Sequence, residues 1–265
     1  MISHKAFNNI TNLVKVHSGI HLSESKKQLV IGRLSKRLRH LNLPNYDAYY
    51  EACMSSTDEL QVMINTLTTN ETSFFREAHH FEFMRSYILP HAKHSPFRVW
   101  SAAASIGAEG YSIAMELDDV LTLRGIEWEI IGTDINTEVI ERASKGLYAM
   151  RFAEQIPKEY LKRYCLKGVG VHEGEFLIDD YLRKKVSFSS ANLMVPIASE
   201  LGQFDVIFLR NMLIYFDNEN RKRIVNYVLK ALKPNGYLFI GHAESITHLS
   251  TKIHQIKPTI YRNGA

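Results

Sequence analysis

Residues 97–115 have the sequence FRVWSAAASIGAEGYSIAM, in which an apolar run is followed by small residues and then by a helix-forming stretch. Four more short runs rich in Val, Ile and Phe follow it: WEIIGTDI (128–135), VSFSSANL (186–193), FDVIFL (204–209) and GYLFIG (236–241). Helix-forming stretches separate several of these runs. Alternating strands and helices are typical of a mostly parallel sheet covered by helices on both faces. We therefore predict an open α/β domain over residues 81–265.

One segment of this domain interrupts the alternation. Residues 160–188 contain several glycines and short β-like pieces, as in YCLKGVGVHEGEFLIDD (164–180). Glycine-punctuated short strands are typical of hairpins. We therefore predict a small antiparallel insertion at about 160–188.

The first 80 residues have a helical periodicity instead. In residues 26–41, Ile31, Leu34 and Leu38 recur at spacings of three and four, which places them on one face of a helix. We predict a helical N-terminal domain over residues 1–80, with the linker to the α/β domain at its end.

A row of basic residues occupies another face of the same predicted helix. Lys26, Arg33 and Arg37 share that face, and Glu24 is the only acid nearby. Such a row is either a solvated surface or a docking surface for an acidic partner. Nucleic acid is one acidic partner, but the aromatic residues that a single-strand binder needs are missing from this row.

Composition excludes several classes of protein. Of the 265 residues, 45% are hydrophobic and 23% are charged, which is typical of a globular chain. Cys53 and Cys165 lie too far apart for a disulfide scaffold or a thiolate zinc site. The N-terminus lacks the apolar core of a signal peptide, and no apolar run approaches the roughly 18 residues of a membrane span. We therefore expect a cytoplasmic protein.

Polar residues follow the predicted strands, at the edge where open α/β sheets bind ligands. Asp134 follows the second strand and is positioned to accept hydrogen bonds from ribose hydroxyls, whereas Asn136 suits the cap of the next helix. Asn192 and Asn211 follow later strands, where amides bind an adenine edge or satisfy loop backbone. The set indicates a nucleoside without phosphates, because no phosphate-binding glycine pattern is present.

Five segments together resemble the CheR family of chemotaxis-receptor glutamate O-methyltransferases, which use S-adenosylmethionine. They are TNETSFFRE (69–77), residues 97–115, IIGTDIN (130–136), FDVIFLRNMLIYF (204–216) and GYLFIGHAES (236–245). They occur in order over nearly the whole chain. The resemblance implies a Rossmann-like methyltransferase domain with a small antiparallel β-subdomain, preceded by an all-α domain.

The resemblance also implies site residues. The cofactor, which leaves as S-adenosylhomocysteine, would be bound by Asn70, Thr72, Arg76, Glu109, Asp134, Asn192, Leu193, Arg210 and Asn211. Tyr215 and Arg76 would lie at the reacting methyl group. The partner would be the cytoplasmic helical domain of a methyl-accepting chemoreceptor, docked on Lys26, Arg33 and Arg37. A receptor tail peptide would pair beside Gly168, Gly170 and Gly174, which otherwise only turn a hairpin.

The turn at 105–112 departs from the family pattern. Members usually have a sequence close to STGEEPYS, whereas this chain has SIGAEGYS, with changes at Ile106, Ala108 and Gly110. Glu109 is retained. We expect cofactor binding to persist, and a diverged homologue that binds cofactor or receptor without catalysis is the alternative.

The expected chemistry needs no catalytic base and no metal. A glutamate carboxylate is ionised at neutral pH, since its reference pKa is about 4.3, and it attacks the sulfonium methyl directly. His79 and His80 are adjacent rather than at zinc spacing, so we predict no metal. A nucleic-acid methyltransferase ranks below both other hypotheses, because the (N/D)PP(Y/F) motif is absent. We expect a monomer by default.

Overall fold

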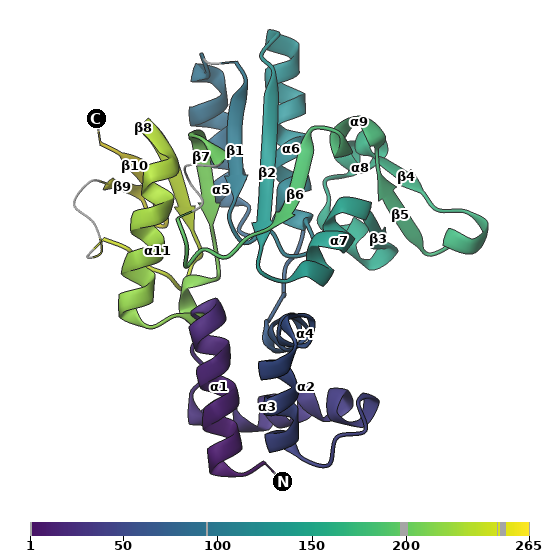
Figure 1. Cartoon of the computed structure of the whole chain (residues 1–265). Coiled ribbons are helices and arrows are strands. Elements are labelled where there is room, and N and C mark those ends of the chain that lie inside the picture. Colours follow the sequence, from purple (N-terminus) through teal and green to yellow (C-terminus); the bar gives the residue numbers. More distant parts are fainter. Residues whose placement is uncertain (1, 94, 197–200, 248, 250–252, 265) are drawn as a thin grey trace.

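The computed structural model describes residues 2–93, 95–196, 201–247, 249 and 253–264. A helical domain lies below an α/β domain in Figure 1. Its helices are α1 (His4–Ser18), α2 (Lys27–His40), α3 (Tyr46–Ser55) and α4 (Thr57–Leu67). Polar caps set where three of them begin, because the side chains of Ser3, Asn45 and Ser56 accept first-turn N–H groups. In the described ranges, no helix is both long and apolar enough to cross a membrane.

The α/β domain is built on one seven-stranded sheet with the order β6-β2-β1-β7-β8-β10-β9. Five strands are parallel: β6 (Val186–Ser190), β2 (Trp128–Asp134), β1 (Phe97–Ser101), β7 (Phe204–Leu209) and β8 (Leu232–Ile240). Helix α6 (Ala108–Leu121) lies behind the sheet in Figure 1 and α11 (Asn218–Ala231) lies in front. Further helices are α5 (His79–Phe83) and α7 (Thr137–Lys145). The predicted fold class is confirmed.

Two features of the sheets differ from the predictions. The sheet ends in an antiparallel hairpin, β9 (Ile253–Lys257) and β10 (Ile260–Asn263), which the sequence analysis missed. The small antiparallel sheet, at the right of Figure 1, has the order β3-β5-β4 and starts before the predicted residue 160. Its strands are β3 (Leu147–Ala149), β4 (Cys165–Lys167) and β5 (Glu175–Ile178), flanked by α8 (Lys158–Tyr164) and α9 (Asp180–Arg183). β6 leaves this insertion and joins the main sheet.

A single apolar cluster joins the two domains. It includes Phe7 of α1 and Leu34 of α2 together with Trp100 of β1 and Val228 of α11, all of them fully or almost fully buried. A second cluster lies around α6 on the other side of the sheet. Burial of apolar surface stabilises a protein by about 25 cal/mol per Å². The helical domain is therefore held against the sheet by the same kind of packing that holds the sheet together.

Polar contacts place the helical domain at the carboxyl ends of the parallel strands. Gln61 Nε2 of α4 donates to the Ile135 carbonyl directly after β2, at 3.0 Å. On the other side, the His21 N–H donates to the Tyr215 carbonyl beyond β7, at 2.9 Å. The ligand-binding edge of the sheet is therefore covered by α1, α4 and the linker after α4.

Candidate cofactor-binding site

A cavity of about 390 Å³ lies between the carboxyl ends of the strands and the helical domain. All the predicted cofactor-binding and catalytic residues line it: Asn70, Thr72, Arg76, Glu109, Asp134, Asn192, Leu193, Arg210, Asn211 and Tyr215. They come from the linker, from α6 and from the loops after β2, β6 and β7. The structure therefore brings together residues separated by up to 145 positions in the chain.

The small-residue turn between β1 and α6 forms the base of this cavity. Ser105 and Gly107 both have left-handed backbone, with φ of 50° and 85°. A β-carbon built on Gly107 would lie 2.8 Å from Ala143 Cβ and 2.9 Å from Phe188 Cζ. Glycine is therefore required here both by the backbone conformation and by the close approach of α7. The turn forms despite the changes at Ile106 and Gly110.

The substitution Gly107→Ala tests this constraint. We expect it to lower the free energy of unfolding by about 2–3 kcal/mol, because it adds left-handed strain and overpacking. Gly125→Ala is the matched control, since Gly125 also has positive φ, 68°, but open space around it. Urea unfolding of both variants measures the difference. Equal losses would show that crowding at Gly107 contributes nothing.

Asp134 at the end of β2 is a half-buried acid that lines the cavity. Its Oδ2 accepts the Ser105 N–H at 2.9 Å and its Oδ1 accepts the Asn136 N–H at 3.0 Å. Burial raises the pKa of Asp134, and these backbone donors oppose that shift. Each carboxylate oxygen has two lone pairs and therefore retains one for a ligand hydroxyl. Asn136 caps α7, as predicted, by accepting the N–H groups of Glu138 and Val139.

Glu109 and Arg210 form a buried ion pair at the other end of the cavity. Arg210 Nη1 donates to Glu109 Oε2 at 3.0 Å, and Glu109 Oε1 accepts the Ser101 hydroxyl at 2.6 Å. Arg210 Nη2 donates to the Arg76 carbonyl of the linker. The Arg210 side chain is only 2% exposed, so its charge depends on these partners.

The linker between α4 and α5 contacts the turn directly. The Ser105 hydroxyl donates to the Asn70 carbonyl at 2.9 Å, and the Phe75 N–H donates to Ser112 Oγ at 3.0 Å. Arg76 Nη1 donates to the Glu71 carbonyl at 3.0 Å. These bonds hold the linker across the opening of the cavity.

The asparagine side chains are already engaged within the protein. Asn192 Nδ2 donates to the His17 carbonyl of α1 at 2.7 Å, and its Oδ1 accepts the Met194 N–H at 2.9 Å. Asn211 Nδ2 donates to Glu77 Oε1 at 3.1 Å. Contact of either amide with an adenine edge stays a prediction. Satisfaction of loop backbone, the alternative, accounts for Asn192.

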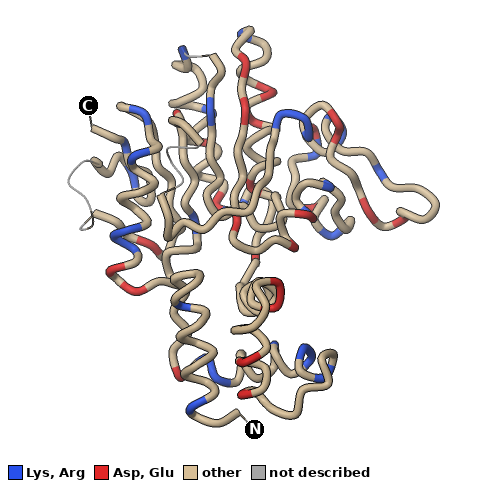
Figure 2. The backbone as a smooth tube through the Cα atoms, in the orientation of Figure 1, with Lys and Arg blue, Asp and Glu red and all other residues tan. Residues whose placement is uncertain are grey.

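Two of the three residues of the predicted basic row have partners within the protein, and their role in receptor docking stays a prediction. Arg37 forms a two-bond pair with Glu59 of α4, at 2.8 and 2.5 Å, and this pairing raises the pKa of Arg37. Arg33 donates to the carbonyls of Leu67 and Thr68, both at 2.8 Å. Arg37 therefore holds α2 against α4, and Arg33 holds α2 against the C-terminal end of α4. Figure 2 shows basic residues on both domains, and α2 itself carries five of them and no acidic residue.

Lys26 differs from those two arginines. It lies in the short 3-10 turn before α2 (Glu24–Lys26), is exposed, and lines the cavity. Of the predicted row, it is therefore the cation available at the opening of the site.

The three glycines of the insertion shape its loop. The Gly168 N–H donates to the Glu175 carbonyl at 2.9 Å, and a β-carbon on Gly168 would lie 2.0 Å from the His172 carbonyl oxygen. Gly170 and Gly174 have positive φ, 60° and 85°. The hairpin-turning alternative therefore accounts for all three. Pairing of a receptor peptide beside these glycines stays a prediction.

Two functional carboxylates were missed by the sequence analysis. Glu244 is half-buried, and desolvation raises its pKa; it accepts backbone N–H groups from Gly241, Asn211 and Leu213 at 2.6, 2.9 and 2.7 Å. It thereby fixes the loop that carries Arg210 and Tyr215. Glu244 belongs to the segment GHAES, which the family resemblance includes, but it lies far in sequence from the loop that it holds.

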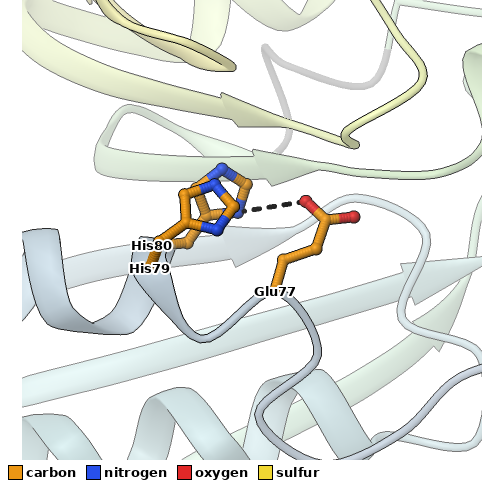
Figure 3. A group of neighbouring side chains, drawn as sticks. All are labelled: Glu77, His79 and His80. Atoms are coloured by element: carbon orange, nitrogen blue, oxygen red, sulfur yellow. Dashed lines mark ion pairs between the residues drawn. The ribbon is translucent and has the colours of Figure 1, made fainter.

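The second missed carboxylate is Glu77, which lies with His79 and His80 at the start of α5 (Figure 3). Their ligand atoms lie within 4.8 Å of one another, a grouping that the adjacent histidines alone did not predict. However, Arg210 Nη2 lies 3.6 Å from Glu77 Oε2 and repels any cation placed there. The prediction that the protein needs no metal stays a prediction.

The fold and cavity together define a class of protein. A mostly parallel sheet with a cavity at its carboxyl edge, an acid after β2 and no phosphate-binding turn is the arrangement of a Rossmann-like S-adenosylmethionine-dependent methyltransferase. Comparison with known families agrees. The CheR methyltransferase all-alpha domain matches residues 5–68, and the CheR methyltransferase SAM binding domain matches residues 70–262. The chain belongs to the CheR methyltransferase family.

Curated relatives cover almost the whole chain. The chemotaxis protein methyltransferase of Escherichia coli K12 is 38% identical over 262 residues, spanning 98% of this chain and 91% of the relative. That of Salmonella typhimurium is 40% identical over 263 residues, spanning 98% and 90%. That of Borreliella burgdorferi is 34% identical over 269 residues, spanning 96% and 94%. The protein is therefore an S-adenosylmethionine-dependent methyltransferase of chemotaxis.

Proposed function

We propose that this methyltransferase converts glutamate side chains of chemoreceptors to methyl esters, working in the cytoplasm on the receptor's helical domain. The observation that supports it most directly is the opening of the cavity, where Tyr215, Arg76 and Lys26 all line one space. A cation and a hydrogen-bonding hydroxyl suit a carboxylate substrate, which needs to be aligned but not deprotonated.

The cavity residues fit the cofactor. Asp134 retains lone pairs for ribose hydroxyls, the Glu109 carboxylate retains acceptor capacity beside its pair with Arg210 for an ammonium group, and buried Leu193 offers an apolar surface for a base. When bound, S-adenosylmethionine supplies a methyl group on a sulfonium. We assign to Tyr215 and Arg76 the task of orienting the substrate carboxylate, and to the linker the exclusion of water.

A methyl-transfer assay tests this function. The protein is incubated with methyl-labelled S-adenosylmethionine and membranes that carry receptors, and the receptor is then treated with alkali. A carboxyl methyl ester releases volatile label under these conditions. Receptors with the methylated glutamates replaced by alanine serve as the control. Alkali-stable label, or label in nucleic acid, would contradict the proposed substrate, and cofactor binding without any transfer would favour the non-catalytic alternative.

Tyr215→Phe tests the orienting role of the hydroxyl. Loss of a hydrogen bond to a charged group costs about 1.5–3 kcal/mol, so we expect kcat to fall about 10–100-fold with unchanged affinity for S-adenosylhomocysteine. Tyr227→Phe on α11, outside the cavity lining, is the matched control. Steady-state kinetics and calorimetry separate the two quantities. Unchanged turnover in Tyr215→Phe would remove the hydroxyl from the mechanism.

Lys26→Glu tests receptor docking. We expect the KM for receptor to rise about tenfold at low ionic strength, with a smaller effect in high salt, because screening weakens exposed charge interactions. Lys36→Glu, at an exposed position of α2 outside the cavity lining, is the control. Calorimetry with S-adenosylhomocysteine checks that cofactor affinity is unaffected. Equal effects of the two reversals would show that net charge, rather than Lys26 itself, controls receptor binding.

We propose the free edge of β4 as the binding place of a receptor tail peptide. β4 pairs with β5 only, and no other described strand pairs with its outer edge. An extended peptide adds to such an edge through backbone hydrogen bonds.

A further inference from the structure

Unpaired polar atoms gather at one place beside the cofactor cavity. Among the described residues, four buried side-chain atoms have no hydrogen-bond partner: Tyr49 OH, Glu77 Oε2, His80 Nδ1 and Arg210 Nε. The last three belong to one cluster. Glu77 Oε2 lies 3.6 Å from His80 Nδ1 and 3.6 Å from Arg210 Nη2. Arg210 Nε belongs to the same planar guanidinium as Nη2. Buried polar groups normally have partners, so three unpaired atoms on three neighbouring side chains indicate a ligand.

The protonation of His80 follows from its other nitrogen. The Thr259 hydroxyl donates to the Pro258 carbonyl at 2.6 Å, so its oxygen is the acceptor for His80 Nε2–H at 2.7 Å. A neutral imidazole with its proton on Nε2 carries a lone pair on Nδ1. Burial, with the Arg210 charge, lowers the pKa of His80 to about 2, so the ring is neutral.

The cluster therefore presents two acceptors and one donor. The acceptors are Glu77 Oε2 and His80 Nδ1, which lie 3.6 Å apart (Figure 3). With the His80 proton on Nε2, neither atom donates to the other. The donor is Arg210 Nε–H. A metal ion would satisfy both acceptors, but it cannot accept a hydrogen bond from Arg210. The positive guanidinium beside it would also repel the ion. One water molecule donates twice and accepts once, which matches all three atoms.

We propose that a single buried water binds between Glu77, His80 and Arg210, and that Glu77 and His80 are positioning residues for Arg210. The other two nitrogens of Arg210 already hold Glu109 Oε2 and the Arg76 carbonyl. A bond at Nε adds a third contact, which holds the guanidinium plane at its remaining nitrogen. Through Arg210, the water therefore links the start of α5 to Glu109 and Arg76, which both line the cofactor cavity.

A pair of substitutions at His80 separates this role from packing. The amide of asparagine overlaps the position of histidine Nδ1, whereas that of glutamine overlaps Nε2. His80→Asn therefore keeps an acceptor for the water, and His80→Gln keeps the donor to Thr259 instead. We expect the Kd for S-adenosylhomocysteine to rise about tenfold in His80→Gln and to change less than about twofold in His80→Asn.

Melting temperatures measured in parallel report the packing loss, which both variants share. A Kd that rises as much in His80→Asn as in His80→Gln would overturn the positioning role.

A crystal structure of the full chain with S-adenosylhomocysteine tests the water itself, and it does not depend on any variant folding. We expect one peak at hydrogen-bonding distance from all three atoms, without anomalous signal. An anomalous peak would mean a metal ion, and direct contact between Glu77 and Arg210 without a peak would mean that no ligand binds. Either result would overturn the proposal.

Discussion

Asp134→Ala is expected to weaken binding of S-adenosylhomocysteine by about 100-fold or more. The substitution removes the acceptor proposed for both ribose hydroxyls, and a hydrogen bond to a charged group contributes about 1.5–3 kcal/mol. Two such bonds correspond to at least a 100-fold change in Kd. The substitution also leaves the N–H groups of Ser105 and Asn136 without their acceptor, which loosens the turn at the base of the cavity. Calorimetry measures the affinity.

Asp134→Asn is the conservative comparison. Its amide keeps one oxygen acceptor and the shape of the side chain, so we expect an intermediate loss of affinity. Thermal unfolding of both variants shows whether the fold survives. Full affinity in a folded Asp134→Ala protein would mean that the nucleoside lies elsewhere in the cavity.

Arg210→Met is expected to lower the free energy of unfolding by about 3–5 kcal/mol and to abolish methyl transfer. Removing one partner of a buried ion pair leaves an uncompensated charge, which is the costly case. Here two carboxylates, Glu77 and Glu109, lose the same guanidinium, and both are only 13% exposed. Urea unfolding followed by circular dichroism gives the stability.

The matched control is Arg142→Met on α7, where the arginine is exposed. Exposed charges contribute about 0–1 kcal/mol, so this variant should unfold like the parent protein. If Arg210→Met were equally stable, the pair with Glu109 would have no structural role, and any loss of activity would reflect the cofactor alone.

Local patterns in the sequence predicted the sheet and the cavity well. Strand-ending residues such as Asp134 lie at one edge because parallel strands share their direction, so position in the chain translates directly into position in space. The same holds for Asn136, whose capping role depends only on the next two N–H groups. The family resemblance added Arg76 and Tyr215, which no local pattern identifies.

The sequence analysis did not find the partners of several polar side chains, because these partners lie far away in sequence. Arg37 and Arg33 were predicted from their helix face alone, but Glu59 and the end of α4 lie 22 to 35 residues further on. Asn192 bonds to a carbonyl 175 residues earlier. A helical face shows which side chains point together, but it does not show which surface they meet.

The apolar cluster that runs from α1 through the sheet to α11 limits how this protein can be divided. Exchanging the first four helices with those of a relative would replace one side of the apolar interface between the two domains and leave the other side unchanged. Volume mismatches inside a close-packed interior cost about 1–3 kcal/mol each. Chimeric enzymes built to swap receptor preference should therefore carry α11 and the ends of β7 and β8 along with the transplanted helices.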